Sequence, residues 1–66
     1  MHFGRTFRLH QLNKNIPTHD IAAKLGVTPQ QVYRWYKAPD VKLSLLITIA
    51  EVIDVDPQEL FIEAIN

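Results

Sequence analysis

Apolar residues recur along the chain three and four positions apart, which is the spacing of one face of an α-helix. The first run predicts a helix over residues 4–14 and is made of Phe3, Phe7, Leu9, Leu12 and Ile16. Gly4 is expected to weaken the start of this helix by about 1 kcal/mol relative to alanine. Pro17 ends the run, because a proline disfavours helical backbone in the residue before it.

Cap residues divide the next part of the chain into two short helices. A second helix is predicted over residues 18–25, with Thr18 as its N-cap and Gly26 supplying left-handed backbone at its end. Thr28 and the proline after it form the cap-plus-proline signature of a third helix over residues 29–37. Only one residue separates this cap from Gly26, so a tight turn is expected to join the two helices.

Two further helices complete the pattern. Ser44 is predicted to cap a fourth helix that ends at Ile53, and Asp56 with its following proline opens a fifth that reaches Ala64. No segment alternates between apolar and polar residues as a strand does. The sequence therefore predicts one all-α domain of five short helices over residues 1–66. The inward-facing residues of helices two to four are expected to be Ile21, Ala22, Leu25, Val32, Trp35, Leu46, Ile49, Ala50 and Ile53.

Charge is distributed unevenly although the net charge of the chain is zero. Residues 1–42 hold all seven Lys and Arg side chains and two acidic ones, a net charge of +5. Residues 43–66 hold five acidic side chains and no Lys or Arg. Such asymmetry is typical of a surface that faces a polyanion. A short acidic segment that keeps the domain soluble explains it equally well.

Composition favours a binding module over an enzyme. A domain of 66 residues leaves little volume for a shaped catalytic pocket, and no nucleophile–base arrangement is present. With no cysteine and no ligand spacing among its three histidines, the chain is expected to need no metal or other cofactor. It has neither a secretory signal nor an apolar segment long enough to span a membrane, so a cytoplasmic protein is expected.

The two helices joined by Leu25-Gly26-Val27-Thr28 form a helix-turn-helix pattern. The stretch over residues 18–37 resembles the helix-turn-helix of the phage Cro and repressor family, the broad group also called XRE-like. Residues 44–61 resemble the fourth and fifth helices of that family, so the resemblance extends over about residues 4–62. The features that match are small Ala22, Gly26 in the turn, and apolar Ile21, Leu25, Val27, Val32 and Trp35.

The resemblance implies a compact, five-helix, lambda-repressor-like domain that binds double-stranded DNA and regulates transcription. It also implies that Thr18, at the start of helix two, contacts a phosphate, although Thr18 suits a plain N-cap equally well. Thr28, at the start of helix three, is expected to act first as a cap and second as a phosphate contact. The family often ends its recognition helix with Asn-Gly, whereas this chain has Tyr36-Lys37-Ala38-Pro39 there. Lys37 is then expected to supply the phosphate contact that the asparagine makes.

Helix three carries one continuous polar stripe opposite the side expected to face the core. At about 100° per residue this stripe consists of Gln30, Tyr33, Arg34 and Lys37, with no acidic member. Gln pairs with the major-groove edge of adenine and Arg with that of guanine. Lys37 suits a phosphate, Tyr33 suits either a phosphate or the methyl group of a thymine, and Gln31 is expected to point sideways toward a neighbouring base or phosphate. A solvated helix face would have a similar stripe, so the DNA assignment depends also on the turn and the resemblance.

The segment from Leu60 to Asn66 is unusually apolar, and it suggests either a homodimer contact or a last cap over the first helix. Sequence-specific proteins of this fold commonly bind two half-sites as twofold dimers. The leading interpretation is a Cro- or repressor-type transcriptional regulator that occupies an operator. The alternatives are the DNA-binding antitoxin of a toxin–antitoxin pair, and a protein-interaction module on the same fold.

Overall fold

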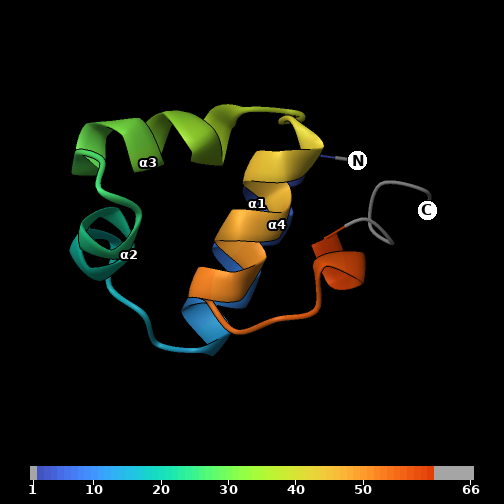
Figure 1. Ribbon diagram of the computed structural model, residues 1–66, viewed down its shortest axis with the longest axis horizontal. Helices are drawn as coiled ribbons and strands as arrows, with labels where there is room; N and C mark the ends of the chain where they lie inside the picture. Colours follow the sequence, from blue (N-terminus) through green and yellow to red (C-terminus); the bar gives the residue numbers. More distant parts are fainter. Residues whose placement is uncertain (1, 61–66) are drawn as a thin grey trace.

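The computed structural model describes residues 2–60, which contain helices and no strand (Figure 1). The all-α prediction is confirmed, and a fifth helical segment begins at Pro57 and is described as far as Leu60. The predicted bounds of the second and third helices coincide with those observed. The four complete helices are α1 (Phe3–Asn13), α2 (Thr18–Leu25), α3 (Pro29–Lys37) and α4 (Leu43–Val52).

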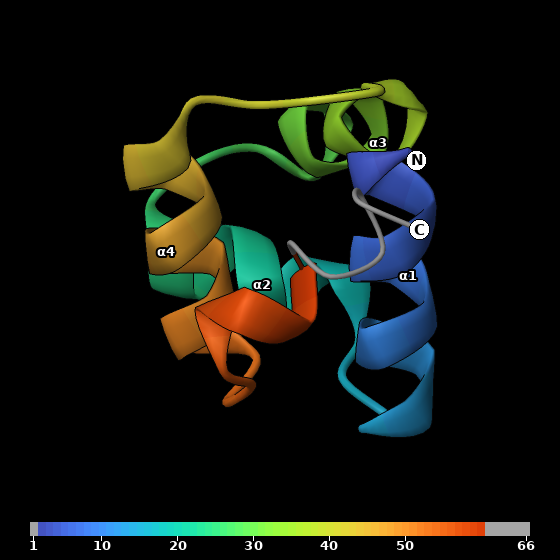
Figure 2. The same ribbon diagram turned by 90° about the vertical axis from the view of Figure 1, so that its right-hand side faces the viewer.

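The helices enclose one core, with α3 lying across one end of α1 (Figure 1). In Figure 2, α1 and α4 stand on opposite sides of the molecule, while α3 crosses above α1. Helix α2 packs against both α3 and α4. The outer side of α3 is therefore left uncovered by the other helices.

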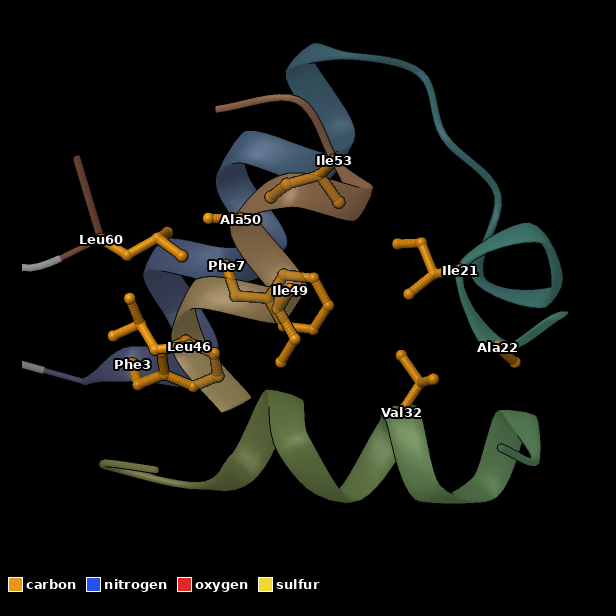
Figure 3. Packing of buried hydrophobic residues seen from close by; sticks show 10 residues of the cluster. All are labelled: Phe3, Phe7, Ile21, Ala22, Val32, Leu46, Ile49, Ala50, Ile53 and Leu60. Carbon is orange, nitrogen blue, oxygen red and sulfur yellow. The ribbon is translucent and has the colours of Figure 1, made fainter. Parts of the chain in front are cut away.

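The core combines residues from all four helices and from the fifth segment (Figure 3). The predicted inner face of α4 is confirmed, and Leu25 and Trp35 lie half-buried at the border of the core. Ile21 of α2 and Val32 of α3 point toward each other between their helices. The buried apolar residues are Phe3, Phe7, Ile21, Ala22, Val32, Leu46, Ile49, Ala50, Ile53 and Leu60.

Only some of the apolar residues that predict α1 lie on its buried face. Leu9 and Leu12 are 61% and 54% exposed, whereas Gln11 is buried. Phe3, Phe7 and Gln11 follow one another at four-residue spacing, so they share the face that points into the core. Leu9 and Leu12 lie a part-turn away from this face and meet solvent.

Two predicted caps are wrong. The N-cap of α2 is Pro17, and Thr18 is the first helical residue, with its hydroxyl bonded elsewhere. Helix α4 begins one residue earlier than expected, after Lys42, and without a side-chain cap. Ser44 therefore lies inside the first turn, where its carbonyl accepts a hydrogen bond from Thr48 Oγ1 at 3.0 Å.

Three other predictions about the ends of helices are confirmed. Thr28 Oγ1 accepts a hydrogen bond from the backbone N–H of Gln31 at 3.2 Å and so caps α3. Asp56 Oδ1 accepts one from the N–H of Gln58 at 2.9 Å at the start of the fifth segment. Gly26 follows α2 with a left-handed φ of 70°.

Gly4 has a structural purpose that helix propensity does not reveal. A Cβ at this position would overlap the carbonyl oxygens of Trp35 and Tyr36, which belong to the last turn of α3. The backbones of α1 and α3 approach closely here, and Gly4 N–H donates to the carbonyl of Ala38 at 3.0 Å. Phe3 N–H likewise donates to the carbonyl of Pro39 at 2.8 Å. A glycine is thus required where the start of α1 meets the end of α3.

Candidate nucleic-acid interface

The turn between α2 and α3 is fixed by backbone hydrogen bonds. Gly26 N–H donates to the carbonyl of Ala23 at 3.3 Å, and Val27 N–H donates to that of Ala22 at 3.0 Å. This pair of bonds defines a Schellman motif, which needs left-handed backbone at the residue after the helix. Gly26 takes that conformation without steric cost, so α3 starts in a defined direction.

Packing between α2 and α3 sets which face of α3 turns outward. Val32 is fully buried against the core, and Ala22 is small enough for the two helices to approach closely. Because a helical turn holds 3.6 residues, the burial of Val32 places Gln30 and Arg34, two residues before and after it, on the outer side of α3. The rotation of α3 about its axis therefore follows from apolar contacts.

The outer face of α3 carries the four side chains of the predicted stripe. Gln30, Tyr33, Arg34 and Lys37 are all exposed, Tyr33 by 52%. Within residues 2–60 the ion pair found joins His19 to Asp20, so neither Arg34 nor Lys37 has an acidic partner there. The α3 face thus presents two cations, an amide and a phenol to solvent.

The other predicted site residues lie around this stripe. Gln31 is half-buried at its edge. Thr28 is exposed at the start of α3, with its hydroxyl used as the cap. Thr18 lies at the start of α2 and near the opposite end of α3, because its hydroxyl bonds to Tyr36. The seven predicted residues therefore belong to the two helix starts and to one face of α3.

A ring of hydrogen bonds among Gln11, Thr18 and Tyr36 joins α1, α2 and α3. Tyr36 Oη donates to Gln11 Oε1, and Gln11 Nε2 donates to Thr18 Oγ1 at 3.4 Å and to the carbonyl of Ile16 at 2.8 Å. Since the Tyr36 proton is used, Thr18 Oγ1 is the donor in its 3.0 Å bond to Tyr36 Oη. Every polar atom of the ring is satisfied, as buried polar groups require.

Gln11 and Tyr36 are not among the site residues predicted from the sequence. A signal for Gln11 was present, because a polar residue at four-residue spacing from Phe3 and Phe7 falls on the buried face of α1. Tyr36 stands directly after Trp35 at the end of α3, and periodicity alone does not distinguish its hydroxyl from a solvated one. Tyr36 is 25 residues from Gln11 and 18 residues from Thr18, so only the fold brings its hydroxyl to them.

A tight helix–turn–helix with an uncovered, basic outer face defines the class of helix-turn-helix DNA-binding domains. The chain belongs to the Cro/C1-type family of these domains, whose model matches residues 11–62. The resemblance found in the sequence is thereby confirmed. No curated protein and no solved structure matches the chain significantly.

Two kinds of feature are absent from the described part of the chain. None of the helices between residues 2 and 60 has the length and hydropathy needed to cross a membrane. In the same residues, no three His, Asp or Glu side chains come together in a way that would hold a metal ion.

Proposed function

We propose that this domain reads a specific sequence of duplex DNA with α3 in the major groove, as a transcriptional regulator of Cro or repressor type that occupies an operator. The observation that carries the proposal is the outer face of α3, where four hydrogen-bonding side chains are exposed and no acidic residue intervenes. The major groove admits an α-helix and displays a different hydrogen-bonding pattern for each base pair. A binding role of this kind requires no catalysis.

The side chains of α3 divide into two roles in this proposal. Gln30 and Arg34 read base edges, because an amide pairs with adenine and a guanidinium with guanine through two hydrogen bonds each. Tyr33 and Lys37 contact phosphates, and half-buried Gln31 reaches a neighbouring base or phosphate from the edge of the stripe. Thr28 contacts the backbone at the start of α3.

Thr18 binds a phosphate in this proposal through its backbone N–H. Its hydroxyl already donates to Tyr36, which leaves the amide at the first position of α2 for the ligand. A helix N-terminus carries a partial positive charge and free N–H groups, so it favours an anion. The ring of Gln11, Thr18 and Tyr36 then fixes this amide relative to α3.

Homodimerisation remains part of the proposal only for residues 61–66, which lie outside the described residues. Leu60, the first residue of the apolar segment, is fully buried in the same core as Phe3 and Phe7. It thus serves as a cap over the core, and a dimer contact would have to come from the residues after it. The cytoplasmic location belongs to the proposal because a regulator acts where its DNA is.

The proposal is tested by fluorescence anisotropy with random-sequence duplex and with an operator selected in vitro, at several salt concentrations. Binding should weaken steeply with salt as phosphate contacts are lost. The Gln30→Ala/Arg34→Ala variant should lose about 1–3 kcal/mol of discrimination per bidentate pair, with a smaller loss on random duplex.

A matched control, Lys14→Ala/Gln58→Ala, removes one cation and one amide from exposed positions outside α3 and should keep the discrimination. If no duplex binds at low salt, the DNA-reading role is wrong and the protein-interaction alternative gains support. A second chain that co-purifies with the protein would instead favour the antitoxin role.

A further inference from the structure

The start of α1 carries a pair of arginines beside the end of α3. Arg5 and Arg8 are three residues apart, so their side chains leave α1 on the same side. The Arg8 guanidinium carbon lies 4.6 Å from the centre of the Tyr36 ring, the arrangement of a cation–π contact. Neither arginine forms an ion pair with an acidic residue of the described chain.

Tyr36 connects these arginines to the face of α3 that we propose reads DNA. Its ring centre lies 5.9 Å from that of Tyr33, in an edge-to-face contact, and Tyr33 belongs to the exposed stripe. Its hydroxyl bonds to Thr18 at the start of α2. Arg8, Tyr36, Tyr33 and Thr18 therefore form one continuous surface along the flank of α3.

A hollow of about 310 Å³ opens in this surface. Its lining is mainly apolar and is made by Gly4, Arg5, Arg8, Leu9 and Tyr36, two of which are arginines. A DNA strand offers the complementary chemistry, with apolar deoxyribose rings between anionic phosphates. Figure 2 shows α1 on the same side of the molecule as α3, with α4 opposite.

We propose that Arg5 and Arg8 bind backbone phosphates of the DNA strand that flanks α3, extending the contact beyond the start of α2. The inference rests on the proposed function and adds a third helix to the DNA-binding surface. A guanidinium suits this role because its planar donors match the oxygens of a phosphate. Stacking on Tyr36 holds the Arg8 guanidinium in place before binding. Contacts to phosphates fix orientation and affinity without reading the sequence.

The test compares Arg5→Gln/Arg8→Gln with the wild-type chain in the same anisotropy titration. Each lost phosphate contact lowers the slope of log affinity against log salt by about 0.9, so the double variant should lose about 1.8. Between 50 and 200 mM salt, the affinity of the wild-type chain should then fall about twelvefold more than that of the variant. Random and selected duplexes should be affected alike, since the contacts carry no sequence information.

Lys14→Gln is the matched control because it removes one cation from the C-cap of α1, at the opposite end of this helix from Gly4, where α1 meets α3. Lys14→Gln should leave the slope of log affinity against log salt unchanged. Arg8→Lys should also largely keep the wild-type slope, because the positive charge remains. Arg5→Gln alone removes an exposed side chain and serves as the variant least able to disturb folding, with an expected slope change of about 0.9.

A double variant with the wild-type slope would overturn this inference and leave the proposed function standing. A loss that appears only on the selected operator would also overturn it, because it would assign base reading to these arginines. If the wild-type chain binds no duplex at all, the proposed function fails, and this inference fails with it.

Discussion

Helix α3 is held by two junctions of different chemistry. Against α2 it packs through apolar side chains, with Ile21 and Val32 fully buried and facing each other (Figure 3). Against α1 it is held by backbone hydrogen bonds at the close approach of Gly4, and by the polar ring through Tyr36. The apolar junction sets the rotation of α3, and the polar junction fixes where its last turn lies.

The difference between the junctions concerns tolerance to change. An apolar contact is not directional, so a substitution by another apolar residue of similar volume is often tolerated. A hydrogen-bonded ring and a backbone contact depend on particular atoms, and removing one of them leaves the others buried without a partner. The α1–α3 junction should therefore be sensitive to changes of a single atom, and the α2–α3 junction to changes of volume.

The largest effect is expected from Ile21→Ala at the apolar junction. Removing a fully buried isoleucine side chain should lower the free energy of unfolding by about 2–5 kcal/mol, measured by urea denaturation. That is a large fraction of the stability of a small domain. Leu12→Ala is the control, because Leu12 belongs to the apolar run of the sequence and yet is mostly exposed. An equal cost for the two variants would contradict the core described here.

A smaller but unusual effect is expected from Gly4→Ala. Helix propensity alone would make this change stabilising by about 1 kcal/mol. The new Cβ would overlap the carbonyls of Trp35 and Tyr36, so we expect instead a loss of about 1–3 kcal/mol, together with weaker DNA binding as α3 is displaced.

Gly26→Ala provides the comparison for that measurement. A Cβ on Gly26 meets no atom, and its cost comes only from the left-handed backbone, about 1–2 kcal/mol. Thermal unfolding of both variants separates steric overlap from backbone strain. A more stable Gly4→Ala protein would show that α1 and α3 do not approach as closely as described.

The same contrast explains what could be predicted from the sequence. The bounds of α2 and α3, the inner face of α4 and the cap at Thr28 all follow from local spacing and local hydrogen bonds. The need for Gly4 and the hydrogen bond between Gln11 and Tyr36 each depend on residues 25 or more positions apart in the sequence. A periodic pattern contains no information about such partners.

Thr18 shows most clearly which roles cannot be predicted from the local sequence. Its position before a predicted helix fits an N-cap, and only its distance to Tyr36 reveals that its hydroxyl joins another helix. The stripe on α3 was accessible to prediction because it is the complement of a buried face. The support beneath it was not, since polar residues at a helix junction look like surface residues in the sequence.

The most specific effect is expected from Tyr36→Phe, which removes one oxygen and keeps the ring that packs against Phe7 and Arg8. Gln11 Oε1 loses its donor, and the Thr18 hydroxyl loses its acceptor, so unfolding should become easier by about 1–3 kcal/mol. Tyr33→Phe, at an exposed residue, should change stability by less than about 0.5 kcal/mol.

A double-mutant cycle that combines Tyr36→Phe with Thr18→Val should give a coupling of about 0.5–3 kcal/mol if the two hydroxyls act as one unit. Additive effects would mean that the start of α2 and the end of α3 are positioned independently, and the phosphate site proposed at Thr18 would then not depend on Tyr36.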